Sequence, residues 1–430
     1  MKQKLTVLSA DALVYEDVEL MRQMPNYSKY LEGGSRVKKV RSIYPTITYP
    51  CHTTMCTGVW PEKHGIVGNL KLDPGASYIP WKWFRDASKW DEDIFKAAKR
   101  AGLTTAALFW PVTAGHPDID YLIPEYWPQP GDTDIREVFR RAGSSEEMID
   151  LVDSQLHGCE IRTHPDTDDF LMRCAREIII RHQPDLLMIH PGNVDGYRHK
   201  NGVFNDRVLE GVKETDRFIG ELMAAVEEAG LADCTNFVLT SDHGQIDIKR
   251  VMKPNVLLQE AGLLTLNDEG RITDWKAVSQ SGGTCAMVYL KDPSDRETYE
   301  KTYKVLKDAA QEGVYGFESV FTEEETREKY HLGGDFSFVL ETDGFTSFQD
   351  AATRPIVTTY QFDDYRYGKA THGHLPEKGP QPIFSAKGPA FRDGVTIERA
   401  NLVDEAPTFA KVLGAELKDA DGIALEQLLR

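Results

Sequence analysis

The sequence predicts an α/β fold with an open, mostly parallel sheet and helices on both faces. Short apolar runs at 5–8, 186–190 and 236–240 indicate buried strands, because strands covered on both faces are apolar throughout. Amphipathic helical patterns lie at 167–182 and 206–228. Strands that alternate with helices are typical of a parallel sheet. Each of the three runs is followed by acidic or acid/histidine residues, and ligands of such sheets gather beyond the carboxyl ends of the strands.

The first part of the chain contributes further core elements in order. A strand is expected at 36–43, and a helix begins at about Pro50, since proline is favoured in the first helical turn. An amphipathic helix is expected at 91–101, followed by a strand at 104–110. These elements extend the same alternating pattern.

Two segments depart from that pattern. Residues 71–90 are rich in tryptophan, proline and lysine, which favours a surface excursion near the mouth of a site. Residues 111 to about 165 are irregular and proline-rich, and we expect a cap-like insertion over one edge of the core. His116, His157 and His164 fall inside it and are expected to be exposed loop residues.

The pattern changes again after residue 252. Strands at 284–290 and 336–341 flank a charged helix at 294–312, which indicates a small α+β subdomain inserted at 253–367. The α/β core then resumes. We therefore expect a core of residues 1–252 and 368–430, closed by a strand at 382–389 and a helix at 405–413.

Composition limits the possible partners. The 430 residues carry a formal net charge of −18, and such a field repels nucleic-acid polymers and anionic membrane surfaces. A small phosphorylated substrate is compatible with this charge, because bound metal ions reverse the local field. The sequence leaves the oligomeric state open.

The cysteines and the N-terminal residues bear on the compartment. The six cysteines form no CxxC pair, so a thiolate zinc site is not expected. Scattered cysteines of this kind are typical of the free thiols of a reducing compartment. The apolar run at 5–8 is too short for a signal peptide or a membrane span. We therefore expect a cytoplasmic protein.

Thr48 lies just before Pro50, where a loop turns into a helix. A helix N-terminus offers free N–H groups and a partial positive charge, which suits a phosphate. Thr-x-Pro is common, so this pattern alone is weak evidence for a nucleophile. Its significance depends on metal-ligand candidates elsewhere in the chain.

Three carboxylates and three imidazoles could bind two divalent ions. Mixed Asp/His sets suit Zn²⁺, with Mn²⁺ or Fe²⁺ as competitors. Two ions can hold the attacking and leaving oxygens of an in-line displacement, and metal coordination would activate a threonine hydroxyl. Singly, each candidate has a structural explanation, and His374 could replace His372. The candidates are Asp11, Asp195 and His199 in the loop after the strand at 186–190, Asp242, His243 and His372.

These motifs, taken in order, resemble one family. The chain is similar to the nucleotide pyrophosphatase/phosphodiesterase family of the alkaline phosphatase superfamily, from about residue 5 to 390. That resemblance implies an alkaline-phosphatase-like fold. It rests on Asp11, Pro45-Thr46-x-Thr48-Tyr49-Pro50-x-His52, Thr57-Gly58-x-x-Pro61-Glu62-x-His64-Gly65-Ile66-x-Gly68-Asn69, Phe109-Trp110-Pro111, Asp195-x-x-x-His199, Asp242-His243-Gly244 and Thr371-His372-Gly373.

The resemblance implies a role for each motif residue. Thr48 would be the nucleophile, forming a phospho-threonine intermediate, and Asn69 would donate a hydrogen bond to a phosphoryl oxygen. One Zn²⁺ would be held by Asp195, His199 and His372. The second would be held by Asp11, Asp242 and His243, with Thr48 as its bridge to substrate. Tyr49, Phe109 and Trp110 would stack on a base or leaving group, or else pack in the core.

Two positions depart from the family pattern, and several activities fit it. Cys51 stands where the family usually has asparagine, and His374 where it often has an aromatic residue. The first expectation is a two-metal hydrolase of phosphodiester or pyrophosphate bonds in nucleotide-like substrates. Phosphonoacetate-hydrolase-like or phosphomonoesterase activity on the same scaffold is the alternative. A cofactor-independent phosphomutase usually carries serine as nucleophile and a large insertion, and a binding protein without catalysis would not need every ligand.

Overall fold

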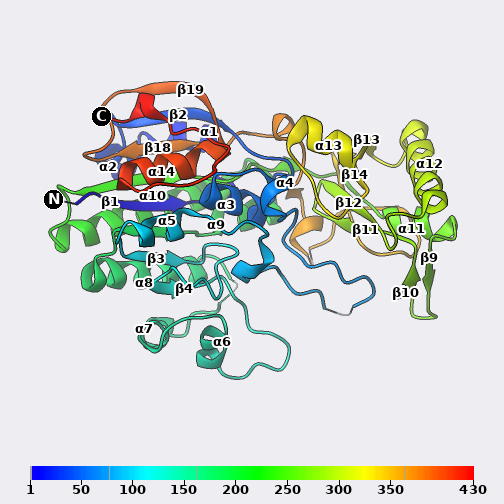
Figure 1. Cartoon of the computed structure of the whole chain (residues 1–430), viewed down its shortest axis with the longest axis horizontal. Coiled ribbons are helices and arrows are strands. Elements are labelled where there is room, and N and C mark those ends of the chain that lie inside the picture. Colours follow the sequence, from blue (N-terminus) through cyan, green and yellow to red (C-terminus); the bar gives the residue numbers. More distant parts are fainter. Residues whose placement is uncertain (1, 77, 162, 363) are drawn as a thin grey trace.

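The computed structural model describes residues 2–76, 78–161, 163–362 and 364–430. Its centre is an eight-stranded sheet. In spatial order the strands are β19 (Thr396–Asn401), β2 (Ser35–Arg41), β18 (Phe384–Lys387), β6 (Thr235–Thr240), β1 (Lys4–Ser9), β5 (Leu186–Ile189), β3 (Thr105–Leu108) and β4 (Tyr121–Ile123). In the left half of Figure 1 the strands follow one another from β19 at the top to β4 at the bottom. The outer strand β19 is largely exposed, whereas the central strands β6 and β5 are buried along their whole length.

The sheet is mostly parallel, as the apolar runs predicted. β1 pairs in parallel with both β5 and β6, so these three strands end at one edge of the sheet. β18 alone runs antiparallel to its neighbours β2 and β6. Chain segments that follow β1, β5 and β6 are therefore brought together beyond their carboxyl ends.

Helices cover both faces, because alternate residues of the central strands point to opposite sides. Leu8 and Leu239 face one apolar cluster, whereas Val7 and Val238 face the other. The first cluster is covered by α1 (Tyr15–Met21), α2 (Pro25–Tyr30), α8 (Asp166–His182) and α10 (Asp206–Glu228), and the second by α3 (Thr48–Thr57), α5 (Ile94–Arg100) and α14 (Glu405–Leu413).

Residues 111–165 are more closely integrated than the expected cap. They supply the edge strand β4, which pairs in parallel with β3. They also form α6 (Ile135–Arg141) and α7 (Glu146–Leu156), and Met148, Ile149 and Val152 of α7 join the apolar cluster of the core. The sequence did not predict β4, because a strand of only three residues is too short to show a periodic pattern.

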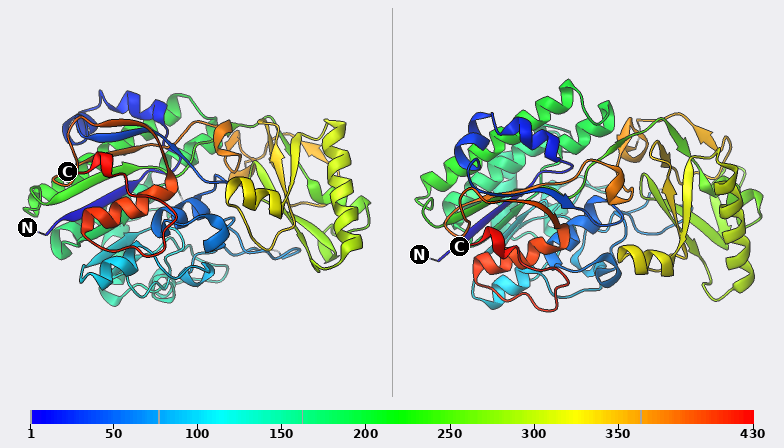
Figure 2. Two further views of the ribbon diagram at one scale, coloured as in Figure 1. Left: turned by 45° about the horizontal axis from the view of Figure 1, so that its top comes forward. Right: turned by 90° about the horizontal axis from the view of Figure 1, so that it is seen from above.

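A second structural unit lies at the other end of the elongated molecule (Figure 2). It has its own apolar core and an antiparallel sheet of β11 (Ala277–Ser281), β12 (Cys285–Leu290), β14 (Phe338–Thr342) and β13 (Phe317–Thr322). Its helices are α11 (Pro254–Glu260), α12 (Arg296–Glu312) and α13 (Glu323–Tyr330), and smaller pairings are formed by β9 (Leu264–Leu266) with β10 (Ile272–Trp275) and by β8 (Arg250–Met252) with β15 (Thr346–Phe348) and β16 (Val357–Thr358).

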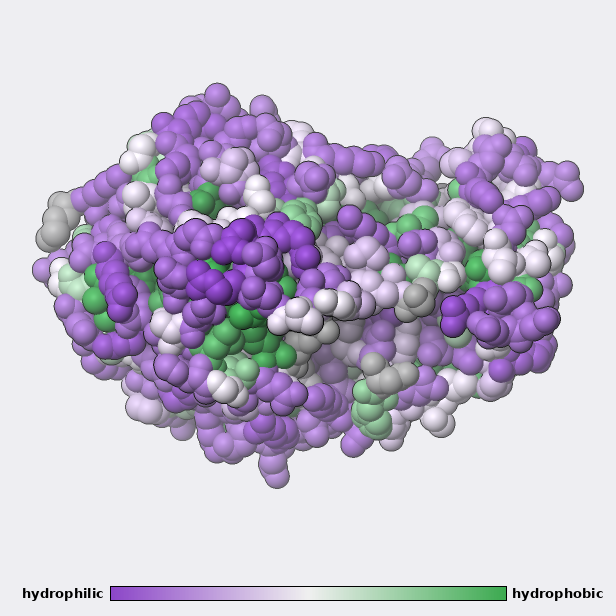
Figure 3. All heavy atoms as spheres, turned by 90° about the horizontal axis from the view of Figure 1, so that it is seen from below, coloured by the Kyte–Doolittle hydropathy of each residue, from purple (hydrophilic) through white to green (hydrophobic). Residues whose placement is uncertain are grey.

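Two short strands connect this unit with the core. β7 (Ile246–Asp247) pairs with β17 (Ala370–Thr371), so the chain leaves and re-enters the core at neighbouring points. The face of the molecule in Figure 3 is mainly hydrophilic. Within the described part of the chain, no helix has the length and apolar character needed to cross a bilayer.

Candidate active site

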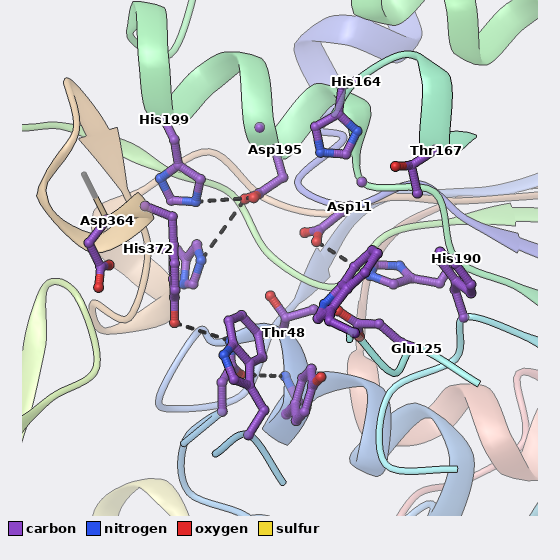
Figure 4. A pocket seen from close by; sticks show the side chains of 18 of the residues that line it. Asp11, Thr48, Glu125, His164, Thr167, His190, Asp195, His199, Asp364 and His372 are labelled. Carbon is purple, nitrogen blue, oxygen red and sulfur yellow. Dashed lines mark hydrogen bonds and ion pairs between the residues drawn. The ribbon is translucent and has the colours of Figure 1, made fainter. Parts of the chain in front are cut away.

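The first group of metal-ligand candidates is built on α9 (Asn193–Asn201). This segment was expected as a loop, but it is a helix, and its geometry places Asp195 and His199 on one face, four residues apart. His199 Nε2 lies 3.0 Å from Asp195 Oδ2, and His372 Nε2, just after β17, lies 4.0 Å from Asp195 Oδ1 (Figure 4). His199 Nδ1 is hydrogen-bonded to the Ala370 carbonyl (2.8 Å), which orients the ring.

The second group lies beyond the neighbouring strands β1 and β6. Asp11 follows β1, and Asp242 and His243 follow β6. His243 Nε2 lies 3.1 Å from Asp242 Oδ2 and 3.5 Å from Asp11 Oδ1. The Ala12 backbone N–H donates to Asp242 Oδ1 at 3.2 Å, with Ala12 in the left-handed region (φ 56°). This strained turn directly after Asp11 helps to fix the Asp242 carboxylate.

Both groups suit divalent cations. In each, the three possible ligand atoms lie within 4.8 Å of one another. Asp11 Oδ1, Asp242 Oδ2 and His199 Nε2 are buried without a hydrogen-bond partner, and unpaired buried polar atoms are costly. Burial raises the pKa values of both Asp11 and Asp242 well above the ordinary carboxyl value. A bound cation would compensate that burial, so the residues fit a two-metal site.

Thr48 lies at the mouth of α3, next to the second group. Its Oγ1 is 3.2 Å from His243 Nε2. His52, one turn further along α3, contacts the Thr48 carbonyl through Nδ1 and Ser9 Oγ through Nε2, both at 2.9 Å. As expected, the residues after Thr48 build the helix: Cys51 is fully buried, with its Sγ 3.4 Å from Ser42 Oγ.

Asn69 is oriented by α3. Its Oδ1 accepts a hydrogen bond from the Tyr49 backbone N–H at 3.0 Å, so its amide nitrogen faces the other way. That Nδ2 donates to Tyr365 Oη at 3.3 Å. Asn69, the predicted hydrogen-bond donor, lines the same pocket as Thr48.

This pocket has a volume of about 410 Å³ and contains both Thr48 and residues of both metal groups. Tyr49 and Phe109 line it, as predicted for substrate contacts. Trp110 does not: it is fully buried in the core, where its Nε1 donates to the His52 carbonyl at 3.3 Å. Successive residues at the end of β3 point to opposite faces, which sends Phe109 to the pocket and Trp110 to the core.

Several pocket residues were not predicted as site residues. Glu125, His164 and His190 line the same pocket, although His164 was expected to be an exposed loop residue. His190 ends the run at 186–190, and its Nε2 lies 3.4 Å from Asp11 Oδ2. Its position at a strand end was the one available signal. His116 is also buried rather than exposed, 2.8 Å from Asp93, whereas His157 is exposed as expected.

The buried carboxyl group of Glu125 should make the stability of the fold depend on pH. Burial raises its pKa to about 7, so the folded protein holds a proton here that the unfolded chain releases at lower pH. Stability therefore falls as pH rises from about 4.5 to 7. We expect Glu125→Gln to stabilise the metal-free protein at pH 8 by up to about 3 kcal/mol, with little effect at pH 4. Thermal unfolding of the wild type and Glu125→Gln between pH 4 and pH 8 measures this difference in stability. A difference that does not change with pH would contradict the prediction.

Comparison with known proteins identifies the family. The model of the type I phosphodiesterase/nucleotide pyrophosphatase family matches residues 5–369. The chain belongs to this family. It lies within the alkaline phosphatase-like superfamily, in agreement with the motifs from Asp11 to His372. The family match ends at residue 369, just before β17, and includes the second structural unit.

Relatives and solved structures agree with this assignment. The chain is 27% identical over 225 residues to mouse ectonucleotide pyrophosphatase/phosphodiesterase family member 1, a match that covers 51% of this chain but 21% of that longer protein. It is 23% identical over 419 residues to the bis(5′-adenosyl)-triphosphatase of Xenopus laevis, covering 96% of this chain and 78% of that one.

The fold also matches solved structures. Murine ectonucleotide pyrophosphatase/phosphodiesterase 5 superposes with a TM-score of 0.68 at 20% identity, and the match covers all of both chains. An inactive variant of that murine protein in complex with AMP gives the same TM-score at 21% identity. The mostly parallel α/β fold expected from the sequence is thus confirmed.

Proposed function

We propose that this family member is a two-metal hydrolase that cleaves phosphodiester or pyrophosphate bonds of nucleotide-like substrates. One observation carries the proposal: Thr48 Oγ1 lies 3.2 Å from His243 Nε2, in the pocket that both metal groups line. A hydroxyl next to a metal ligand can itself coordinate the cation, and this coordination would activate it as a nucleophile. The family match and the named activities of the relatives support the same reaction class.

The residues divide the chemistry among them. Bound divalent cations would polarise the phosphoryl oxygens and lower the pKa of a coordinated hydroxyl. Thr48 attacks phosphorus and receives the phosphoryl group, which water then removes. Asn69, its amide fixed by the Tyr49 N–H, donates a hydrogen bond to a phosphoryl oxygen as negative charge develops. Asp195, His199 and His372 bind one cation, and Asp11, Asp242 and His243 bind the other.

Zn²⁺ is the metal that the ligand set favours. Each group combines carboxylate with imidazole, a donor set typical of zinc, and Mn²⁺ or Fe²⁺ can occupy the same ligands. Elemental analysis of the purified protein should find about two zinc ions per chain. A predominance of manganese or iron would contradict this choice while leaving the two-metal site intact.

The pocket favours an aromatic or nucleotide-like substituent on the phosphoryl group. Tyr49, Trp81, Phe109 and Tyr365 line it, and aromatic rings stack on bases. AMP is bound by the inactive murine relative, which supports a nucleotide substrate here. Phosphonoacetate hydrolysis or monoester hydrolysis on the same scaffold is the alternative, because these reactions use the same metal groups.

A substrate panel tests the function. The zinc-loaded enzyme would be assayed with an aryl phosphodiester, an aryl phosphomonoester, a dinucleotide polyphosphate and phosphonoacetate. We expect kcat/KM for the diester or the dinucleotide to exceed that for the monoester by about 100-fold or more, because the second substituent contributes binding energy that a monoester lacks. A faster reaction with the monoester or phosphonoacetate would favour the alternative.

We also propose a reducing compartment, with the cytoplasm as the expected one. All six cysteines are free, and five of them are buried. Thiols persist where glutathione and thioredoxin keep them reduced. Cell fractionation followed by immunodetection tests the location, and recovery from an exported fraction would contradict it.

A further inference from the structure

A buried glutamine links the two metal groups. Gln245 lies two residues after His243, in the segment that follows β6, and its side chain is fully buried. Its Nε2 donates one hydrogen bond to Asp195 Oδ1 and another to the Asp195 carbonyl, the latter at 3.2 Å. The segment that supplies Asp242 and His243 to the second group therefore also contacts a carboxylate of the first group.

These hydrogen bonds determine how the Asp195 carboxylate is turned. Gln245 contacts Oδ1, whereas His199 Nε2 lies 3.0 Å from Oδ2. His372 Nε2, the third possible ligand of the group, lies 4.0 Å from Oδ1. A carboxylate whose rotation is fixed by a hydrogen-bond donor keeps the same lone pairs directed at a cation. The amide of Gln245 thus holds Asp195 in place between the two imidazoles.

The backbone on both sides of Gln245 is fixed. A β-carbon at Gly244 would lie 2.2 Å from the Pro380 carbonyl oxygen, so only glycine lets the chain pass this point. After Gln245 the chain forms β7, which pairs with β17, and His372 directly follows β17. The amide is therefore presented to Asp195 from a segment that is itself connected to the ligands of both groups.

Gln245 is a costly residue if packing is its only role. Its Oε1 is buried without a hydrogen-bond partner, and an unpaired buried polar atom lowers stability. Among the residues that the structure describes, its side-chain amide donates to Asp195 only. The contact with Asp195 is thus the interaction that a polar side chain provides here and an apolar one would not.

We propose that Gln245 is a positioning residue for the first metal group, and that its amide raises the affinity of this group for a divalent cation by fixing Asp195. The inference rests on the two-metal site of the proposed function. Gln245 acts through Asp195 and handles neither substrate nor proton. Hydrogen-bond partners of metal ligands typically contribute about 10- to 100-fold to metal affinity.

Zinc affinity tests this role without any assay of turnover. Metal-free wild type and Gln245→Met would be titrated with Zn²⁺ in competition with a chromophoric chelator, which yields a dissociation constant for each site. Methionine is similar in length to glutamine but donates no hydrogen bond. We expect one of the two dissociation constants to rise by about 10- to 100-fold and the other to change by less than about 3-fold.

Gln381→Met is the matched control. The Gln381 amide donates to the backbone carbonyls of Pro376 and Gly379, so the same substitution removes two hydrogen bonds that do not involve a metal ligand. Both dissociation constants should stay within about 3-fold of the wild-type values. An equal loss of zinc affinity in Gln381→Met and Gln245→Met would overturn the proposal, because any lost amide would then have the same effect.

A second background shows which group Gln245 serves. Asp195→Asn should leave one zinc site, formed by Asp11, Asp242 and His243. Adding Gln245→Met to this variant should change the remaining dissociation constant by less than about 3-fold, because the partner of the amide is already altered. A weaker remaining site would show that Gln245 acts on the second group instead, and would overturn the role assigned to it.

The outcomes separate this inference from the proposed function. A wild type without two zinc sites overturns both. A wild type that binds two zinc ions but hydrolyses nothing in the substrate panel overturns the proposed function, and the titration still decides the role of Gln245. Unchanged zinc affinity in Gln245→Met overturns the positioning role alone. Circular dichroism verifies folding, and Gln245→Asn, whose amide is one methylene shorter, should show the same loss if Gln245→Met fails to fold.

Discussion

Thr48→Ala is expected to reduce kcat by at least about 10,000-fold while both metal sites remain occupied. The substitution removes the oxygen that attacks phosphorus, and loss of a nucleophile costs rates of this order. Thr48 adds only one oxygen to the second metal group, whose three other ligands stay in place. Steady-state kinetics on an aryl phosphodiester and elemental analysis of the same preparation measure both parts.

Two controls sharpen this expectation. Thr48→Ser keeps a hydroxyl at the same backbone position and should retain measurable turnover and form a covalent phospho-enzyme. Thr53→Ala removes a hydroxyl from the same helix. That hydroxyl donates a hydrogen bond to the Tyr49 carbonyl, and Thr53 is not among the residues that line the pocket, so this variant should retain most of the activity. Wild-type rates in Thr48→Ala would refute the assignment of the nucleophile.

Removal of the metal ions by a chelator is expected to abolish turnover and to lower the unfolding midpoint by several degrees. A ligand that binds only the folded state stabilises it by about 4 kcal/mol when its free concentration is 1,000 times its Kd. Re-addition of Zn²⁺ should restore both properties. An enzyme that keeps its rate and its midpoint after chelation would exclude the two-metal site.

The size of this stabilisation should depend on pH. Burial raises the pKa values of Asp11 and Asp242, so the metal-free fold binds more protons than the unfolded chain and loses stability as pH rises. Cations replace these protons when they bind. The difference in midpoint between loaded and metal-free protein should therefore grow from pH 5 to pH 8.

Asp195→Asn, in the other group, should lower the metal content by about one ion per chain.

Much of the fold was predictable because its signals are local. Helix α10 matches the predicted 206–228, since its apolar face repeats regularly and Asn205 caps its first turn. Helix α9 was missed because its nine residues carry little amphipathic pattern: Gly196 interrupts it and its polar residues serve the metal group. Strand β4 was missed because three residues are too few to show a period.

The pocket wall was less predictable than the metal groups. His164 and Glu125 come from segments without regular periodicity, and they reach the pocket only because β4 and α8 place them there. Trp110 shows the opposite case: its neighbour Phe109 lines the pocket, while Trp110 packs against His52 with ring centroids 4.8 Å apart. Motif membership did not distinguish these two adjacent rings.

The sequence alone singled out the residues that we propose for the chemistry. Six metal-ligand candidates and Thr48 were recognisable because five of the candidates follow buried apolar runs and all seven residues occur in one family order. The tertiary structure decided what these residues can do together. It grouped the six ligand candidates into two sets of three, oriented the Asn69 amide and brought His164 into the same pocket as Thr48. Contacts between residues tens to hundreds of positions apart are set by packing of the sheet and its helices, which no local pattern encodes.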